Sequence, residues 1–302
     1  RRPCGAAGVW RPAARLHAVT GSDGAMDDFS KRLRAAGLVR YESALKALAR
    51  PSVRLVAGGS PTKDRGSRLG GLPDLPPSTP WPLNDDEPLS FIAQVDLADV
   101  TAQDTQALLP PDGLLSFFYA AISQEAWGFD PADNGSAVVL YTPSGVDTVP
   151  ADPPVGLAGD GVFKPVALRP EAELTVAPWE SYDVEQLGMS RDEAFAYSEL
   201  FWEGDEVIHR LLGHPDPVQG DMQLECQLVT NGLNCGDSTG YNDPRAQALQ
   251  AGASQWRLLM QVDSQEQAGM MWGDVGRLYY WVKDSDLAGR DWDQSWLILQ
   301  CG

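Results

Sequence analysis

An internal repeat constrains the fold of this chain of 302 residues more than any other feature of its sequence. Residues 91–96, Phe-Ile-Ala-Gln-Val-Asp, recur as residues 258–263, Leu-Leu-Met-Gln-Val-Asp. In both copies an apolar segment that begins at a glycine follows, at residues 113–119 and at residues 276–282. Because short apolar runs of this kind are typical of buried strands, each copy predicts two consecutive strands of a sheet.

A loop that contains glycine and proline precedes each copy, at residues 69–74 and 211–216. Three blocks therefore occur twice in the same order, which chance rarely produces. We expect an ancient duplication with two related halves, at about residues 52–142 and 205–302, and an additional segment in the second half at about residues 220–254.

Other segments predict both helices and strands. A helix is expected from Asp27 to about Arg50, and the capping box that begins at Ser190 predicts another over residues 191–202. Residues 143–180 contain many prolines, which indicates edge strands and loops. Together these elements predict an α+β fold with an N-terminal helix and a few further helices. Strands are expected at residues 52–57, 89–97, 114–119, 137–142, 256–262, 277–282 and 296–300.

The first 25 residues differ from the rest of the chain. They hold four arginines against one acid, and they show neither a helical nor a strand period. A well-formed segment begins only after Met26, so we expect residues 1–25 to be a disordered or mis-called extension and residues 26–302 to form the domain. A transit peptide of the mitochondrial type is the alternative, but the segment has too little serine for one.

The balance of charges limits the classes of partner. The chain has 23 basic and 42 acidic side chains, which gives a net charge of −19. Nucleic acids and anionic membranes are disfavoured, because binding to them depends on lysine and arginine. A basic protein is the partner that this charge would attract, and the alternative is that the charge serves solubility alone.

Neither a membrane span nor a disulfide scaffold is expected. The sequence has no continuous apolar run near the roughly 18 residues that a membrane helix needs, and its start has no secretory apolar region. Four cysteines, Cys4, Cys226, Cys235 and Cys301, are too few and too scattered for a disulfide framework in a chain of this length. We therefore expect reduced thiols in a cytoplasmic protein.

Six motifs along the chain resemble those of the YwqG-like family of bacterial proteins. Among them are a Gly-Gly-x-Pro loop that leads to Trp-Pro, the strand Leu-x-Phe-x-Ala-Gln-Val-Asp-Leu, and a Trp-Gly-Asp-x-Gly turn before a Tyr-Tyr strand. The resemblance covers about residues 26–302 and implies a mixed α+β fold with mainly antiparallel sheets, but it implies no function. The motifs lie at residues 70–82, 89–97, 109–118, 211–219, 258–264 and 272–280.

Two aspartates of the repeat, Asp96 and Asp263, are candidates for chemistry. Strand alternation puts each on the same face as a glutamine, Gln94 or Gln261. If a pseudo-two-fold axis brings the carboxylates together, they form a metal or acid–base site. The alternative is that each aspartate ties loops of its own repeat to the strand, with its pKa lowered by backbone amides. Because both copies keep the pattern and catalytic sites seldom come in pairs, we favour the structural role.

Seven residues together define a candidate ligand cleft between the two halves. Duplicated halves form a natural crevice, and ligand pockets favour such junctions. Tryptophans beside acids are typical of surfaces that bind sugars and peptides, although core packing is the default for any one of them. The seven residues are Trp81, Gln94, Asp96, Gln261, Asp263, Trp272 and Asp274.

Metal and cofactor sites are not predicted. His209, His214, Cys226 and Cys235 suggest a cluster, but their spacing is poor for zinc, so we expect no metal. The sequence also lacks the signatures of serine hydrolases, zinc proteases and dinucleotide-binding folds, so we expect no cofactor.

The glycine-rich segment at residues 66–71 has two interpretations. It lacks the Gly-Lys-Ser/Thr ending of a phosphate-binding loop. Its backbone amides could form an anion nest helped by Arg68 and Lys63. Tight turn geometry is the commoner reason for such glycines.

These observations predict a binding or interaction protein rather than an enzyme. One specific form is an immunity-like protein that masks a basic toxin. A hydrolase that acts on a sugar or peptide through Asp96 and Asp263 is the first alternative, and a purely structural subunit is the second.

Overall fold

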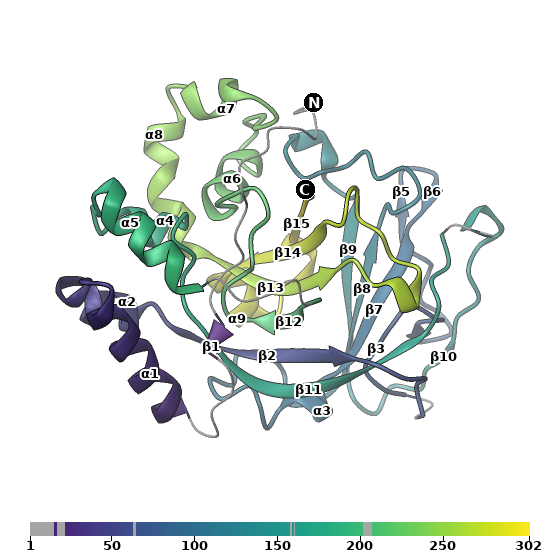
Figure 1. Cartoon of the computed structure of the whole chain (residues 1–302). Coiled ribbons are helices and arrows are strands. Elements are labelled where there is room, and N and C mark those ends of the chain that lie inside the picture. Colours follow the sequence, from purple (N-terminus) through teal and green to yellow (C-terminus); the bar gives the residue numbers. More distant parts are fainter. Residues whose placement is uncertain (1–14, 17–21, 63–64, 158, 160, 202–206) are drawn as a thin grey trace.

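The computed structural model describes residues 15–16, 22–62, 65–157, 159, 161–201 and 207–302. Figure 1 shows a strongly curved sheet with helices gathered at one side. All pairs of described strands are antiparallel, so the predicted α+β fold is confirmed. The main strands are β2 (Arg50–Ala57), β3 (Arg68–Leu69), β7 (Ser90–Asp96), β8 (Leu114–Tyr119), β9 (Ala137–Thr142), β11 (Val166–Thr175), β12 (His209–Leu212), β13 (Trp256–Asp263), β14 (Arg277–Lys283) and β15 (Trp296–Gln300).

Two long strands, β2 and β11, occupy the middle of the sheet and join two sets of four strands. On one side β2 pairs with β12, which is followed outward by β13, β14 and β15. On the other side β11 pairs with β3, which is followed outward by β7, β8 and β9. Each set therefore places its strands in chain order from the centre to the edge of the sheet.

The two sets also agree in local irregularities. The ladder between β7 and β8 is interrupted at Ile92, and the ladder between β13 and β14 is interrupted at Leu259, which is the same place in the repeated motif. After β3 the chain turns at Gly70 with a φ of 55°, and at the end of β12 it turns at Leu212 with a φ of 60°. Because a left-handed backbone favours glycine, the second set accepts strain at Leu212 that the first set avoids.

The prediction of edge strands and loops for residues 143–180 is wrong in one respect, because this region contains the central strand β11. The prediction rests on the many prolines of the region, and one of them, Pro170, lies inside β11. β3 pairs only with the first two residues of β11, and β1 (Arg15–Leu16) pairs only with the last two. Pro170 lies between these two short contacts. At Pro170 the edge of β11 that faces away from β2 therefore has no paired strand among the described residues, and the missing N–H of proline costs no hydrogen bond there.

The prediction of one helix from Asp27 to about Arg50 is also wrong. α1 (Ser22–Ala35) ends before Gly37, and α2 (Glu42–Ala47) follows. Gly37 has a φ of 76°, and the amide after it, of Leu38, donates to the carbonyl of Leu33 at 2.8 Å. This is the glycine-terminated end that closes many helices.

α1 also begins earlier than predicted, within the segment assigned to the extension. Ala25, Phe29 and Leu33 follow each other at intervals of one helical turn, and all three are buried. They pack with Val184 and Tyr197 from a later part of the chain. The apolar stripe therefore starts before Met26, and a boundary at residue 25 is placed too late.

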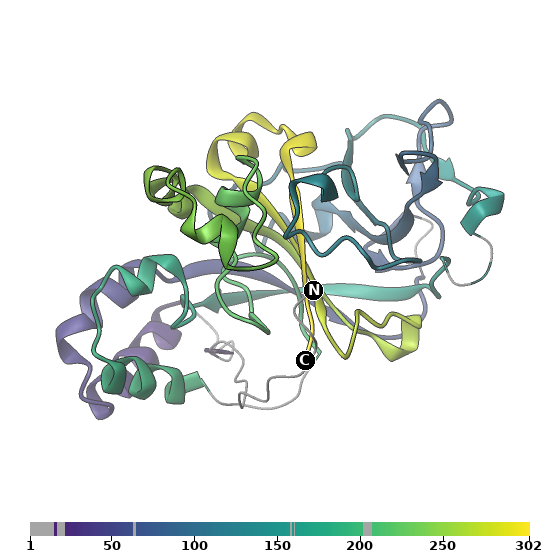
Figure 2. The ribbon, with the colours of Figure 1, turned by 90° about the horizontal axis from the view of Figure 1, so that it is seen from above.

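The remaining helices form two groups, which Figure 2 shows from above. α4 (Tyr182–Glu185) and α5 (Arg191–Ser198) join α1 and α2 in a lobe at one end of the sheet, and the predicted capping box of Ser190 and Glu193 is confirmed at the start of α5. The additional segment of the second half contains α6 (Gln223–Val229), α7 (Ser238–Asn242) and α8 (Ala246–Leu249). None of the helices described is long and apolar enough to cross a membrane.

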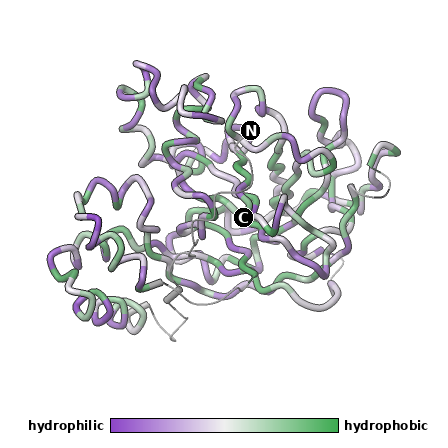
Figure 3. The backbone as a smooth tube through the Cα atoms, turned by 45° about the horizontal axis from the view of Figure 1, so that its top comes forward, coloured by the Kyte–Doolittle hydropathy of each residue, from purple (hydrophilic) through white to green (hydrophobic). Residues whose placement is uncertain are grey.

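The main core lies where the two sets of strands face each other. In Figure 3 hydrophobic stretches run through the middle of the molecule, whereas hydrophilic and hydrophobic residues alternate in the coils at its periphery. Phe117 of β8 meets Tyr280 of β14 with ring centroids 5.1 Å apart. The hydroxyl of Tyr280 donates to the carbonyl of Phe118 at 3.2 Å. One apolar cluster therefore contains side chains of both sets.

We predict that Phe117→Ala lowers the free energy of unfolding by about 3–5 kcal/mol, because it removes a fully buried ring from the contact between the two sets. Urea unfolding measures this loss. Val155→Ala is the control, since Val155 is 94% exposed and its loss should stay within about 0.5 kcal/mol. A loss below about 1 kcal/mol for Phe117→Ala would show that the two sets do not share a core.

Candidate functional site

Each set of strands holds one arginine, one aspartate and one glutamine in a buried cluster. In the first set the cluster joins Arg68 at the start of β3, Asp74 of β4 (Asp74–Leu75) and Gln94 of β7. Arg68 Nη2 lies 2.9 Å from Asp74 Oδ2, and Gln94 Nε2 donates to the same oxygen at 2.8 Å. Gln94 Oε1 accepts from the amide of Asp74 at 2.9 Å. The cluster thereby fixes the loop at residues 69–74 to the sheet.

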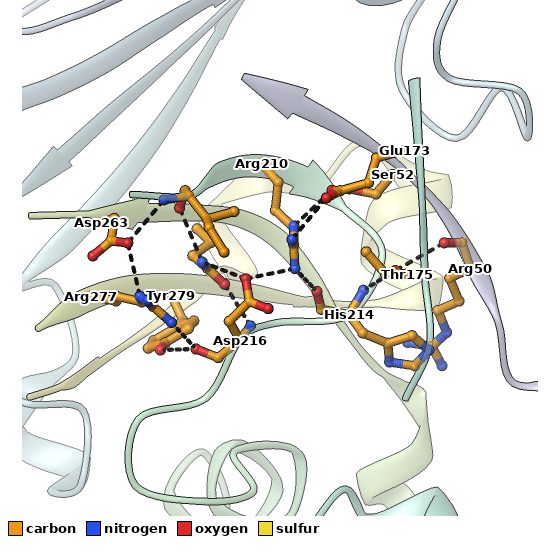
Figure 4. Close-up of polar contacts among 12 residues, drawn as sticks. Arg50, Ser52, Glu173, Thr175, Arg210, His214, Asp216, Asp263, Arg277 and Tyr279 are labelled. Atoms are coloured by element: carbon orange, nitrogen blue, oxygen red, sulfur yellow. Dashed lines mark hydrogen bonds and ion pairs between the residues drawn. The ribbon is translucent and has the colours of Figure 1, made fainter. Parts of the chain in front are cut away.

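The second set repeats this cluster with Arg210, Asp216 and Gln261, and Figure 4 labels its arginine and its aspartate. Arg210 Nη1 lies 3.0 Å from Asp216 Oδ2, and Gln261 Nε2 donates to that oxygen at 3.2 Å. Gln261 Oε1 accepts from the amide of Asp216 at 2.9 Å. The repeated glutamine therefore has the same role in both sets.

Further charges extend the second cluster (Figure 4). Glu173 of β11 contacts Arg210 through both of its oxygens, one 3.1 Å from Nε and the other accepting from Nη2 at 3.1 Å. Arg277 Nε lies 3.0 Å from Asp263 Oδ2. Burial alone would lower the pKa of Arg210, but Asp216 and Glu173 raise it, so the guanidinium stays charged.

The two candidate catalytic aspartates have separate structural contacts. Asp96 Oδ1 accepts from the amide of Ala98 at 3.1 Å and caps α3 (Leu97–Val100). Asp263 Oδ2 accepts from the amide of Ile208 at 3.0 Å and pairs with Arg277. The expectation of a lowered pKa is wrong for Asp263, because burial raises its pKa more than Arg277 and the amide of Ile208 lower it.

The other residues of the predicted cleft lie in different surroundings. Trp272 is fully buried in the shared core, with its ring edge-on to Phe163 at 5.5 Å between centroids. Trp81 is partly buried, and its indole N–H donates to the carbonyl of Leu89 at 2.8 Å. Asp274 is exposed. Since packed side chains fill the contact between the two sets, the structure does not gather these residues with Gln94 and Gln261 in one cleft.

The two histidines of the second set are bound to neighbouring backbone. His214 Nε2 lies 2.7 Å from the carbonyl oxygen of Leu48, and His209 Nδ1 accepts from the amide of Asp263 at 3.1 Å. Burial lowers the pKa of His209 to about 3, so its ring is neutral at pH 7. Within the described part of the chain, no group of three or more His, Cys, Asp and Glu residues is placed to hold a metal ion.

The glycines at residues 66–71 serve the turn rather than an anion nest. The amide of Gly70 donates to the carbonyl of Ile92, and the amide of Gly71 donates to the carbonyl of Phe163, both at 2.9 Å. Both glycines have positive φ, and a Cβ at Gly70 would lie 2.5 Å from the carbonyl oxygen of Lys164. Lys63, the other predicted anion contact, lies outside the described residues.

An open groove of about 670 Å³ lies beside the first cluster, within the size range of ligand sites. Its walls come from two regions that are distant in sequence, the first with residues 60–61 and 68–74 and the second with Pro150 of β10 (Val149–Pro150) and the chain just before β11. Two residues of the predicted cleft contact this lining without belonging to it. Gln94 donates a hydrogen bond to Asp74, and the ring of Trp272 packs against Phe163. The groove is lined by Ser60, Pro61, Arg68, Gly71, Leu72, Asp74, Pro150, Val162, Phe163, Lys164 and Pro165.

A smaller hollow adjoins the second cluster, between Arg50, His214, Trp281 and Asp221. Its free volume of about 10 Å³ corresponds to about one water molecule, so it is no ligand site of useful size. Asp221 accepts from the amide of Leu224 at 3.0 Å at the start of α6. Burial raises the pKa of Asp221 to about 6.

The fold and these sites define a class of antiparallel α+β protein that has a buried Arg–Asp–Gln cluster in each of two strand sets and an open groove beside one of them. The family model described as a domain of unknown function (DUF1963) matches residues 67–301. The chain therefore belongs to this family, and the match spans both clusters. A search of curated proteins finds no match to the chain.

We predict that Arg210→Met lowers the free energy of unfolding by about 3–5 kcal/mol at pH 7, because it leaves the carboxylates of Asp216 and Glu173 buried without their cation. The loss should shrink at pH 5. At the lower pH a buried carboxylate without its cation can take up a proton, and the loss of its charge removes part of the cost of burying it.

Urea unfolding at the two pH values measures this effect. The control is Arg169→Met, which removes an exposed partner of Glu171 and should change stability by less than about 0.5 kcal/mol. Equal losses for Arg210→Met and Arg169→Met would contradict the structural role of the cluster.

We predict that Asp221→Asn stabilises the protein by about 1 kcal/mol at pH 8 and has no effect at pH 4. The stability linked to the raised pKa of Asp221 is present below the ordinary pKa of an aspartate and is lost as the pH rises through about 6. The full shift corresponds to about 3 kcal/mol, which partial exposure of the carboxyl reduces. Asparagine keeps an oxygen that accepts from the amide of Leu224.

Thermal melting at both pH values measures the change. The matched control is Asp237→Asn at the start of α7, where a side-chain hydrogen bond from Thr239 lowers the aspartate pKa. That variant should not gain stability at pH 8. If the Asp221→Asn protein is less stable than the original protein at pH 8, the charge of Asp221 is compensated in the folded state, and the prediction is wrong.

Proposed function

We propose that this chain is a binding protein without catalytic chemistry, and that its ligand site is the groove beside Arg68. The proposal rests on the contrast between the repeated Gln and Asp residues and the lining of the groove. The repeated Gln and Asp side chains are engaged in structural contacts, whereas the groove has room for a ligand and apolar walls with a few polar groups. This composition is typical of sites for small ligands.

The walls of the groove are held in place before any ligand arrives. Leu72 belongs to the loop that Arg68 and Asp74 fix, and Arg68 donates to its carbonyl. Phe163 packs on Trp272 of the core. A preformed site loses less entropy on binding than a mobile one, which favours affinity.

We also propose that the two strand sets arose by duplication and that the chain belongs to the YwqG-like members of its family. The common strand order, the bulges at Ile92 and Leu259 and the repeated cluster support the first point. The six sequence motifs support the second. A cytoplasmic location suits Cys226, which is a free, buried thiol.

Masking of a basic partner is the second candidate function. Burial raises the pKa values of Glu180, Glu185 and Asp221, and the like charges of Asp221 and Glu185 raise the pKa of Glu180 further. A cationic side chain of a partner would relieve this repulsion. The hydrolase alternative has less support, because Asp96 and Asp263 have the contacts of capping and ion-pair residues.

We predict that Val162→Trp weakens the binding of neutral apolar fragments about tenfold, because Val162 lines the groove and is 38% exposed. Saturation-transfer NMR with a fragment library identifies binders, and titration gives their affinities. Val155→Trp is the matched control, since it places the same side chain at an exposed position outside the groove lining. Fragments that bind the Val162→Trp protein as tightly as the control would contradict the site.

A further inference from the structure

The two cluster arginines differ in one contact. Arg210 is paired with two carboxylates: Nη1 lies 3.0 Å from Asp216, Nη2 donates to Glu173 at 3.1 Å, and Nε lies 3.1 Å from the other oxygen of Glu173 without the geometry of a hydrogen bond. The contacts of Arg68 with described residues use only Nη1 and Nη2, on the carbonyls of Gly66 and Leu72 and on Asp74. Nε of Arg68 is thus left without a described partner, and this arginine lines the groove.

The position of Glu173 relative to Arg210 follows from the sheet. Arg210 lies opposite Arg54 of β2, and Arg54 lies opposite Glu171 of β11. Glu173 is two residues further along β11, on the same face as Glu171. The carboxylate of Glu173 therefore reaches the guanidinium of Arg210 although β11 and β12 are separated by β2.

In the first set, the same count leads from Arg68 across two strands to Ser60. Arg68 lies opposite Ala167 of β11. Ala167 in turn accepts from the amide of Gly58 at 3.0 Å and donates to the carbonyl of Gly59 at 3.1 Å, where the chain continues from β2. Two residues beyond Gly58 is Ser60, which is exposed and lines the groove. By this count Ser60 corresponds to Glu173, and it is a short neutral side chain in the lining of the groove.

We propose that the groove binds an apolar ligand through a carboxylate, and that this carboxylate contacts Arg68 as Glu173 contacts Arg210. The inference rests on the proposed function of the groove and adds the chemistry of its ligand. Lys164, which is exposed in the groove lining, supplies a second cation, while Asp74 is the acid among the lining residues. Arginine suits this task because its planar nitrogens match the two oxygens of a carboxylate.

The apolar part of the ligand follows from the other walls. Leu72, Val162 and Phe163 present side chains without charge, and three prolines complete the lining. Free carboxylic acids with a hydrophobic body have this chemistry, and so does a peptide that ends in an apolar residue with a free C-terminus. Both share the group that Arg68 would recognise.

The test compares acids with their amides. 4-Phenylbutyrate and 4-phenylbutanamide represent the free molecules, and N-acetyl-Ala-Ala-Phe with a free or an amidated C-terminus represents the peptide. Their affinities are measured by NMR titration against the full chain. We expect at least one acid to bind about tenfold or more tightly than its amide, and the pair that shows the preference identifies the source of the carboxylate.

Two variants locate the contact. Ser60→Glu places a carboxylate where Glu173 lies in the other set, so it should abolish the preference for the acid, while the isosteric control Ser60→Gln should keep it. Neither substitution removes a buried group, so both proteins should fold. An acid preference that survives in Ser60→Glu overturns the inference.

The outcomes also separate this inference from the proposed function. Equal binding of acids and amides, weakened by Val162→Trp, overturns the carboxylate contact and leaves the groove as the ligand site. If neither these probes nor the neutral fragments bind, the groove is no ligand site, and both proposals fail.

Discussion

The architecture depends on a buried ion pair between an arginine and an aspartate six residues later, with a glutamine of the next strand beside it. Charges removed from water cost several kcal/mol each unless hydrogen bonds satisfy them, and a half-satisfied pair is worse than an apolar core. Here the glutamine donates to the carboxylate and accepts from the aspartate amide, in both sets. The arginine also binds a loop carbonyl, of Leu72 or His214. The result is a loop with a fixed path across the sheet.

Much of the sheet could be predicted from the sequence, because its outer strands are apolar and bounded by glycines. β8 and β9 begin and end at the predicted residues. β11 was missed, since the effect of Pro170 depends on which neighbours lie beside it, and local sequence does not contain that information. The break at Gly37 was missed because the apolar stripe continues across it.

The candidate site shows the same limit. The repeat indicates Gln94 and Gln261 but not their partners, because the repeated loop blocks begin at Leu69 and Leu211. The residue just before each block is an arginine, Arg68 or Arg210, six residues before an aspartate. The groove itself had no local signal, since its lining comes from segments that only the folded sheet brings together. The separate roles of Asp96 and Asp263 likewise depend on neighbours such as Arg277.

The central position of β2 has a consequence for the order in which the protein can form. Its two partners in the sheet, β11 and β12, are more than a hundred residues later in the chain. Contacts between such distant residues close long loops, which slows folding and raises the contact order. During synthesis β2 emerges more than a hundred residues before either partner, with both of its edges open to unintended pairing. Each edge of β2 therefore stays unpaired for longer than the edge of a strand whose partner follows it directly in the chain.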